Sequence, residues 1–98
     1  MFGFVRTAVA SPRLTLADCT ENAREILSVF RQAEAKQVQV LVFPEISLTG
    51  YTCGDLFFQA TLLQAAETAL AYILEETAAS SMVLALGMPV SVGQRLYN

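Results

Sequence analysis

The stretch VQVLVFPEISLTGY, residues 38–51, joins the pattern of a buried β-strand directly to a carboxylate, and the rest of the fold can be predicted outward from it. Its first part, VQVLVF, is nearly continuous in β-branched and apolar residues, which is typical of a buried strand in a parallel sheet. A proline and Glu45 follow directly, and the stretch leaves through a Thr-Gly pair. A carboxylate at the end of a buried strand lowers the stability of the fold by several kcal/mol if it is desolvated without partners. We therefore expect Glu45 to be paired, to be hydrated or to have a function.

The sequence on either side of this stretch alternates between strand and helix patterns. Residues 4–11 and 81–90 are rich in residues that favour strands. Residues 18–37 and 62–79 instead repeat apolar side chains at i, i+3 and i+4, which is the spacing of an amphipathic helix. The predicted order is therefore β-α-β-α-β, with the strand 38–43 in the middle.

This order predicts an α/β fold. Strand–helix–strand units of this length close right-handed with parallel strands, so the strands are expected to form one sheet with helices packed on it. Asp18 and Glu21 have the spacing of a capping box, which predicts that the first helix starts there. A strand as apolar as 38–43 is expected to have helices on both faces.

The carboxyl ends of the strands are where function is expected. In open α/β sheets the functional crevice lies beyond these ends, and Glu45 follows the strand 38–43 at that edge. Ser11, Pro12 and the segment GMPV, residues 87–90, are expected to converge on the same edge. The chain has no G-x-G-x-x-G and no Walker A motif, so nucleotide binding has no motif to support it.

Composition narrows the functional classes. The chain has 98 residues, of which 54% are hydrophobic and 15% charged, so it is globular in character and at most one domain. Its net charge is -3 and its basic residues are scattered, which argues against nucleic-acid binding.

The sequence predicts no membrane segment. Its apolar runs are shorter than the ~20 residues that a bilayer helix needs, and its first residues lack the basic-then-apolar order of a signal peptide. We expect a cytoplasmic protein without a membrane segment.

The two cysteines predict no metal site. Cys19 and Cys53 match neither a disulfide framework nor a metal-ligand spacing, and the chain has no histidine to complete a zinc site. Both are interpreted as thiols.

Each residue of the candidate site also has a purely structural interpretation. Glu45 can cap the turn that follows it, and Tyr51 can cover the loop while its hydroxyl bonds backbone. Gly50 is expected to supply a positive φ, and Asp55 to cap the segment LFFQ. The residue pattern alone leaves these interpretations open.

The segments VLVFPEISLTGY, residues 40–51, and GDLF, residues 54–57, resemble the first signature of the nitrilase, or carbon–nitrogen hydrolase, superfamily. Within it they are similar to the glutaminase domain of glutamine-dependent NAD synthetases. Residues 4–26 are similar to the first strand and helix of that family, and residues 84–98 to its third strand and the approach to the next. The resemblance implies a four-layer α-β-β-α sandwich, of which residues 1–98 are an N-terminal fragment lacking the rest of the domain and any synthetase domain.

The resemblance also implies roles for two residues. Glu45 matches the family's catalytic glutamate, the general base toward a cysteine thiol, and Tyr51 matches a tyrosine that shapes the glutamine pocket. Such a base has to be near the thiol and partly shielded from water. The family's lysine and nucleophilic cysteine lie downstream of the segment matching residues 95–98, so both partners are outside this chain. Lys36 is expected at the opposite end of the strand, and Cys53 lies where the family requires no cysteine.

By the same resemblance, the parent enzyme hydrolyses L-glutamine through a thioester and passes ammonia to a synthetase domain. That domain amidates deamido-NAD with ATP and magnesium, whereas this fragment has no cofactor and is expected to be inactive alone. Two alternatives stay open: another nitrilase-type amidase, and a non-catalytic assembly module. Apolar faces left uncovered predict self-association, which makes a homo-oligomer the expected state.

Overall fold

The computed structural model describes residues 3–50 and 60–98. The predicted β-α-β-α-β order is confirmed, and a hairpin follows it. The elements in chain order are β1 Thr7–Val9, α1 Cys19–Ala35, β2 Val40–Val42, α2 Ala60–Thr77, β3 Val83–Ala85, β4 Val90–Val92 and β5 Arg95–Tyr97.

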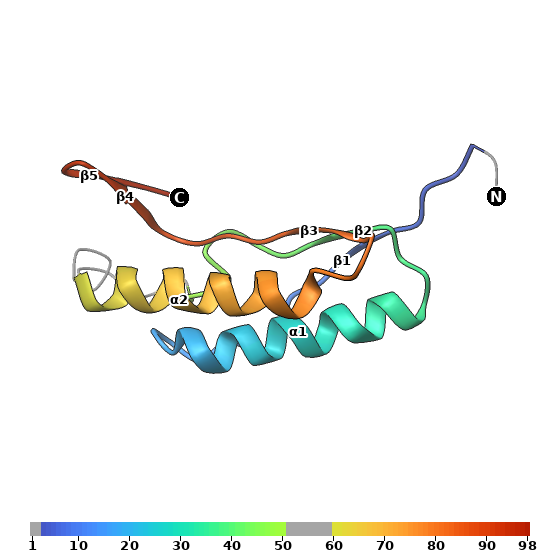
Figure 1. Ribbon diagram of the computed structural model, residues 1–98, viewed down its shortest axis with the longest axis horizontal. Helices are drawn as coiled ribbons and strands as arrows, with labels where there is room; N and C mark the ends of the chain where they lie inside the picture. The colour runs from blue at the N-terminus through green and yellow to red at the C-terminus, as the bar shows by residue number, and fades with distance from the viewer. Residues whose placement is uncertain (1–2, 51–59) are drawn as a thin grey trace.

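The first three strands form one parallel sheet in the order β1-β2-β3. In its central register Ala8 lies beside Leu41, and Leu41 beside Leu84. Both crossovers step in the same direction across the sheet, so right-handed connections put both helices on the same face. Figure 1 shows α1 and α2 together below the strands. The expectation of helices on both faces of β2 is therefore wrong for the part of the chain that the structure describes.

The two faces of the sheet differ sharply in exposure. Side chains alternate along a strand, so the central residue of each strand points toward the helices and its neighbours point away. Leu41, in the middle of β2, is 1% exposed, whereas Val9 and Val83 on the other face are 85% and 59% exposed. The open face is apolar because the sequence of these strands is apolar at every position except Thr7.

The core lies between the sheet and the two helices. Asp18 is the N-cap of α1, and its Oδ1 accepts a hydrogen bond from the Glu21 amide at 3.1 Å, as the capping-box spacing predicted. The described helices are too short or too polar to cross a membrane. The apolar stripes of the helices supply most of the buried apolar side chains: Cys19, Ala23, Ile26, Leu27, Phe30, Ala33, Leu62, Ala66, Ala69 and Ile73.

The segment predicted as one strand, residues 81–90, is divided. β3 ends at Ala85, and the chain leaves the sheet before Pro89, which has no N–H to donate to a ladder. β4 and β5 then pair antiparallel around Gly93, whose φ is +62°. A glycine in a short loop between apolar segments is a hairpin signal, and it lay within the sequence VGQR. The hairpin lies at the end of the molecule away from the N-terminus (Figure 1).

Candidate functional site

Glu45 stands at the start of a tight turn that follows β2. The turn closes on Ile46, whose carbonyl accepts from the amides of Thr49 and Gly50 at 3.2 and 2.9 Å. Ile46 has a φ of +42°, which is uncommon for a β-branched residue and strained. Gly50 has a φ of +91°, as expected from the sequence. The backbone that carries Glu45 is therefore held in an unfavourable conformation by the structure around it.

The exit of β3 packs directly against this turn. A Cβ built on Gly87 would lie 2.1 Å from the nitrogen of Ile46 and 2.7 Å from the carbonyl carbon of Glu45, so only glycine fits there. The Leu48 amide donates to the Gly87 carbonyl at 3.1 Å. The predicted convergence of residues 87–90 on Glu45 is confirmed by these contacts.

The exit of β1 reaches the same edge less closely. The Ala10 amide donates to the Val42 carbonyl at 3.0 Å, and the Ala17 amide donates to the Thr49 carbonyl at 2.8 Å. Ser11 and Pro12, which lie between these contacts, do not line the groove beside Glu45. That groove has a volume of about 350 Å³, and its lining residues are Phe43, Pro44, Glu45, Ala85, Leu86, Gly87, Met88, Val90 and Asn98.

The Glu45 side chain is exposed on the rim of this groove. In residues 3–50 and 60–98 no hydrogen bond or ion pair to its carboxylate is recorded, and the turn is closed by other groups. The shielding from water expected for a general base is therefore not supplied by the described residues. The Glu45 carboxylate is accessible to whatever occupies the groove.

Three buried polar side chains, those of Asn22, Ser47 and Thr49, were missed by the sequence reasoning, and the first two join distant segments. Asn22 on α1 is 0% exposed, and it bonds both Leu48 of the turn and Thr15 of the loop after β1. Ser47 is also 0% exposed, and its Oγ accepts from the Gly87 amide at 3.3 Å. The available signal was an asparagine on the apolar face of the helix, one residue before Ala23.

The other residues singled out in the sequence lie away from the groove or outside the description. Tyr51, Cys53 and Asp55 are outside the described residues. Lys36 is the C-cap of α1 and lies at the amino end of β2, opposite Glu45, as predicted. Among residues 3–50 and 60–98, no group of His, Cys, Asp and Glu side chains is arranged to hold a metal ion.

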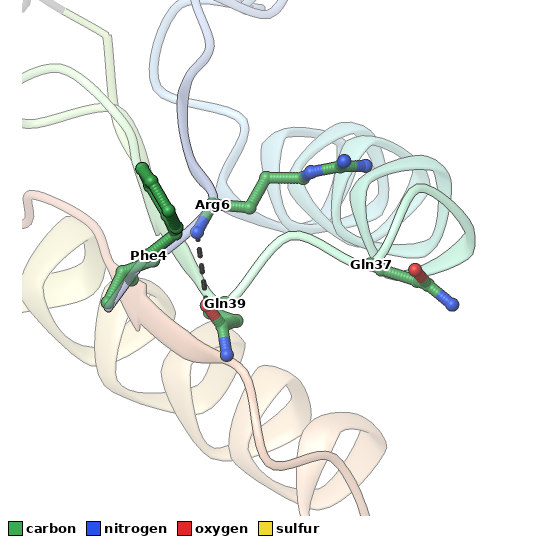
Figure 2. A pocket seen from close by; sticks show the side chains of 5 residues that line it. Phe4, Arg6, Gln37 and Gln39 are labelled. Carbon is green, nitrogen blue, oxygen red and sulfur yellow. Dashed lines mark hydrogen bonds between the residues drawn. The ribbon is translucent and has the colours of Figure 1, made fainter. Parts of the chain in front are cut away.

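A second pocket lies at that opposite edge of the sheet and is shown in Figure 2. Phe4, Arg6, Gln37 and Gln39 line it, and the Arg6 amide donates to the Gln39 Oε1 at 3.0 Å. The Arg6 guanidinium donates to the Lys36 carbonyl at 2.7 Å, so it is engaged in holding the end of α1. This pocket has neither a carboxylate nor a thiol in its lining, and Glu45 remains the better candidate.

In a comparison with known protein families, residues 6–98 match the carbon–nitrogen hydrolase model. The glutamine-dependent NAD(+) synthetase of Mycobacterium leprae is 38% identical over 96 residues, which cover 98% of this chain and 14% of that protein. The corresponding synthetase of Xylella fastidiosa is 30% identical over 99 residues, 100% of this chain and 18% of that protein.

A solved structure agrees with the described fold. The crystal structure of a glutamine-dependent NAD(+) synthetase from Cytophaga hutchinsonii matches with a TM-score of 0.87 and 28% sequence identity. The match covers 96% of this chain and 16% of that chain. The chain therefore spans only a small part of the length of the proteins it matches, and the α/β arrangement is that of a fragment of their fold.

Proposed function

Because this chain belongs to the carbon–nitrogen hydrolase family, we propose that residues 1–98 are the N-terminal part of a glutaminase domain. The observation that carries the proposal is Glu45 itself. It follows β2 at the carboxyl edge of a parallel sheet, on the rim of a groove, and its backbone is fixed by a strained turn. An accessible carboxylate on a rigid backbone can accept a proton from a group that enters the groove, and the chain downstream would supply the shielding from water that such a base needs.

In the proposed reaction Glu45 is the general base. Its carboxylate takes the proton of a cysteine thiol supplied by the chain downstream, and the thiolate attacks the amide carbon of L-glutamine. The proton passes to the leaving nitrogen, ammonia departs, and a thioester remains. Water then attacks the thioester while Glu45 takes a proton from it, the C–S bond breaks to release glutamate, and the proton returns from Glu45 to the departing cysteine thiolate. A downstream lysine would stabilise the oxyanion, and Tyr51 would shape the glutamine pocket.

The whole protein is proposed to be a glutamine-dependent NAD synthetase, the name that its relatives in Mycobacterium leprae and Xylella fastidiosa carry. The ammonia would serve an ATP- and magnesium-dependent amidation of deamido-NAD in another domain. The described residues contain neither a phosphate loop nor a cluster fit for a metal, so no step of that amidation is assigned to them. A cytoplasmic location, where ATP and glutamine are both present, belongs to the same proposal.

Glu45→Gln in the full-length protein tests this function. The amide keeps the shape of the side chain and loses the base, so glutamine-driven NAD formation should fall by about 10²–10⁴-fold, the usual contribution of positioned proton transfer. Synthesis from added ammonia should survive, because that route needs no thioester. Initial rates with each nitrogen source measure both effects.

The matched control is Glu67→Gln, the same chemical change on the exposed side of α2. It should leave both rates unchanged. If Glu45→Gln retains near-normal glutamine-driven turnover, Glu45 is a hydrated turn residue and the proposal fails.

A further inference from the structure

The turn that carries Glu45 is held by buried side-chain hydrogen bonds, and these indicate a second set of functional residues. We propose that Ser47 and Asn22 are positioning residues. They keep the backbone at Glu45 in the conformation that directs its carboxylate toward the thiol. The inference rests on the proposed function, because it assigns these residues a role through Glu45. Neither side chain reaches the groove, whose lining includes Glu45 but not Ser47 or Asn22.

Ser47 joins the turn to the exit of β3. Its Oγ accepts from the Gly87 amide at 3.3 Å, and the Leu48 amide donates back to the Gly87 carbonyl at 3.1 Å. These two bonds engage both polar backbone groups of one glycine from one turn. The Gly87 backbone therefore packs against the peptide unit between Glu45 and Ile46, which leaves no room for a Cβ on residue 87.

Asn22 holds the same turn from the helix side. Its Nδ2 donates to the Leu48 carbonyl at 2.9 Å and to the Thr15 carbonyl at 2.8 Å, and its Oδ1 accepts from the Thr15 amide at 2.6 Å. Both N–H donors of the amide and its oxygen are thus engaged with backbone. A fully satisfied polar side chain at 0% exposure specifies a single arrangement of the groups that it joins.

The turn needs this support because Ile46 is strained. A positive φ at a β-branched residue persists only where the surrounding structure over-determines it. Loss of the Ser47 or Asn22 hydrogen bonds lets Ile46 relax toward negative φ. This rotation changes the direction in which the Glu45 side chain leaves the backbone. A displacement of about 1 Å at a reacting group costs on the order of 10²-fold in rate.

The effect should appear in kcat rather than in KM. Ser47 and Asn22 do not line the groove, so substrate contacts stay in place while the base moves away from the thiol. In the full-length protein, Ser47→Ala and Asn22→Asp should each lower glutamine-driven kcat by about 10- to 100-fold. KM for glutamine and the rate with free ammonia should stay within about twofold. Ser47→Thr, which keeps the hydroxyl, should restore most of the kcat.

Two controls separate positioning from loss of stability. Ile73→Val removes a methylene group from a 1% exposed core residue on α2, so it lowers the unfolding temperature without touching the turn. Ser47→Ala should lose far more kcat than Ile73→Val at a comparable unfolding temperature. In a Glu45→Gln background, Ser47→Ala should cause no further loss, because the group that it positions is already gone.

The possible contrary results distinguish the positioning role from the proposed function. If Glu45→Gln abolishes glutamine-driven turnover but Ser47→Ala and Asn22→Asp behave like Ile73→Val, the positioning role is overturned and the glutaminase proposal stands. The positioning role also fails if the ammonia-driven rate falls together with kcat, or if Ser47→Ala lowers the Glu45→Gln background further. A Glu45→Gln enzyme with full turnover overturns the proposed function itself.

Discussion

Gly87 tests most directly how tightly the Glu45 turn is packed. In Gly87→Ala the added Cβ would lie 2.1 Å from the Ile46 nitrogen, and backbone on both sides cannot move aside as a flexible side chain could. We expect a loss of about 3 kcal/mol of stability, at the upper end of what overpacking usually costs. Thermal unfolding of the protein, followed by circular dichroism, measures it.

Gly93→Ala is the matched control for this substitution. Gly93 also sits where glycine is favoured, with a φ of +62°, but nothing lies within 4 Å of its ideal Cβ. The expected cost is about 1 kcal/mol, from the left-handed backbone alone. Equal losses at Gly87 and Gly93 would show that the contact with Ile46 relaxes freely and that the turn is less rigid than described.

The start of α1 depends on one side chain, Asp18. Its Oδ1 accepts from the Glu21 amide, one of the donors that an α-helix leaves without an intrahelical partner. Asp18→Ala should cost about 1 kcal/mol, and Asp18→Asn, which keeps a capping oxygen, only a fraction of that. The unfolding temperatures of the two variants give the comparison. A loss in Asp18→Asn as large as in Asp18→Ala would mean that the carboxylate charge, rather than the cap, supports the helix.

Local signals made the main elements predictable. The helical spacing and the Asp18 cap lie within single segments of the chain, and the apolar run of β2 needs no partner to be recognised. Glu45 was identifiable for the same reason, since a carboxylate next to such a strand stands out in sequence. The order of the elements then sufficed for a parallel sheet.

The rest depended on contacts between distant segments. That both helices share one face follows from the strand order β1-β2-β3, which the apolar pattern of β2 does not encode. The bond between Ser47 and Gly87 joins residues 40 positions apart, and a serine in a turn has many local partners available. The division of residues 81–90 came from the same contact, because Gly87 leaves the ladder to meet the turn.

The open face of the sheet governs how the isolated chain behaves. Val9, Val42 and Val83 point away from the helices and are 85%, 40% and 59% exposed. A contiguous apolar face on a sheet is a surface that soluble monomers usually cover. In the four-layer fold that the resemblance implies, a second sheet would cover this face. The 98-residue chain alone is left with the face uncovered.

We therefore expect the isolated chain to self-associate at micromolar concentration. Burying apolar surface gains roughly 25 cal/mol per Å², and two copies stacked through their sheets would bury these valines against each other. Static light scattering should give a mass above 10.6 kDa, and a hydrophobic dye should bind at low concentration, where the face is free. A strictly monomeric chain that binds no dye contradicts this expectation.

Val83→Thr and Val92→Thr distinguish the sheet face from apolar surface in general. Both valines are exposed, at 59% and 63%, but Val83 lies on the three-stranded sheet and Val92 on the hairpin. Threonine keeps the β-branched shape and adds a hydroxyl whose burial without a partner is costly, so Val83→Thr should weaken association while Val92→Thr leaves it unchanged. Equal effects would assign association to the hairpin as much as to the sheet. In the full-length protein, where a second sheet is expected to cover Val83, Val83→Thr should instead lower the unfolding temperature, because the same hydroxyl would then be buried within one molecule.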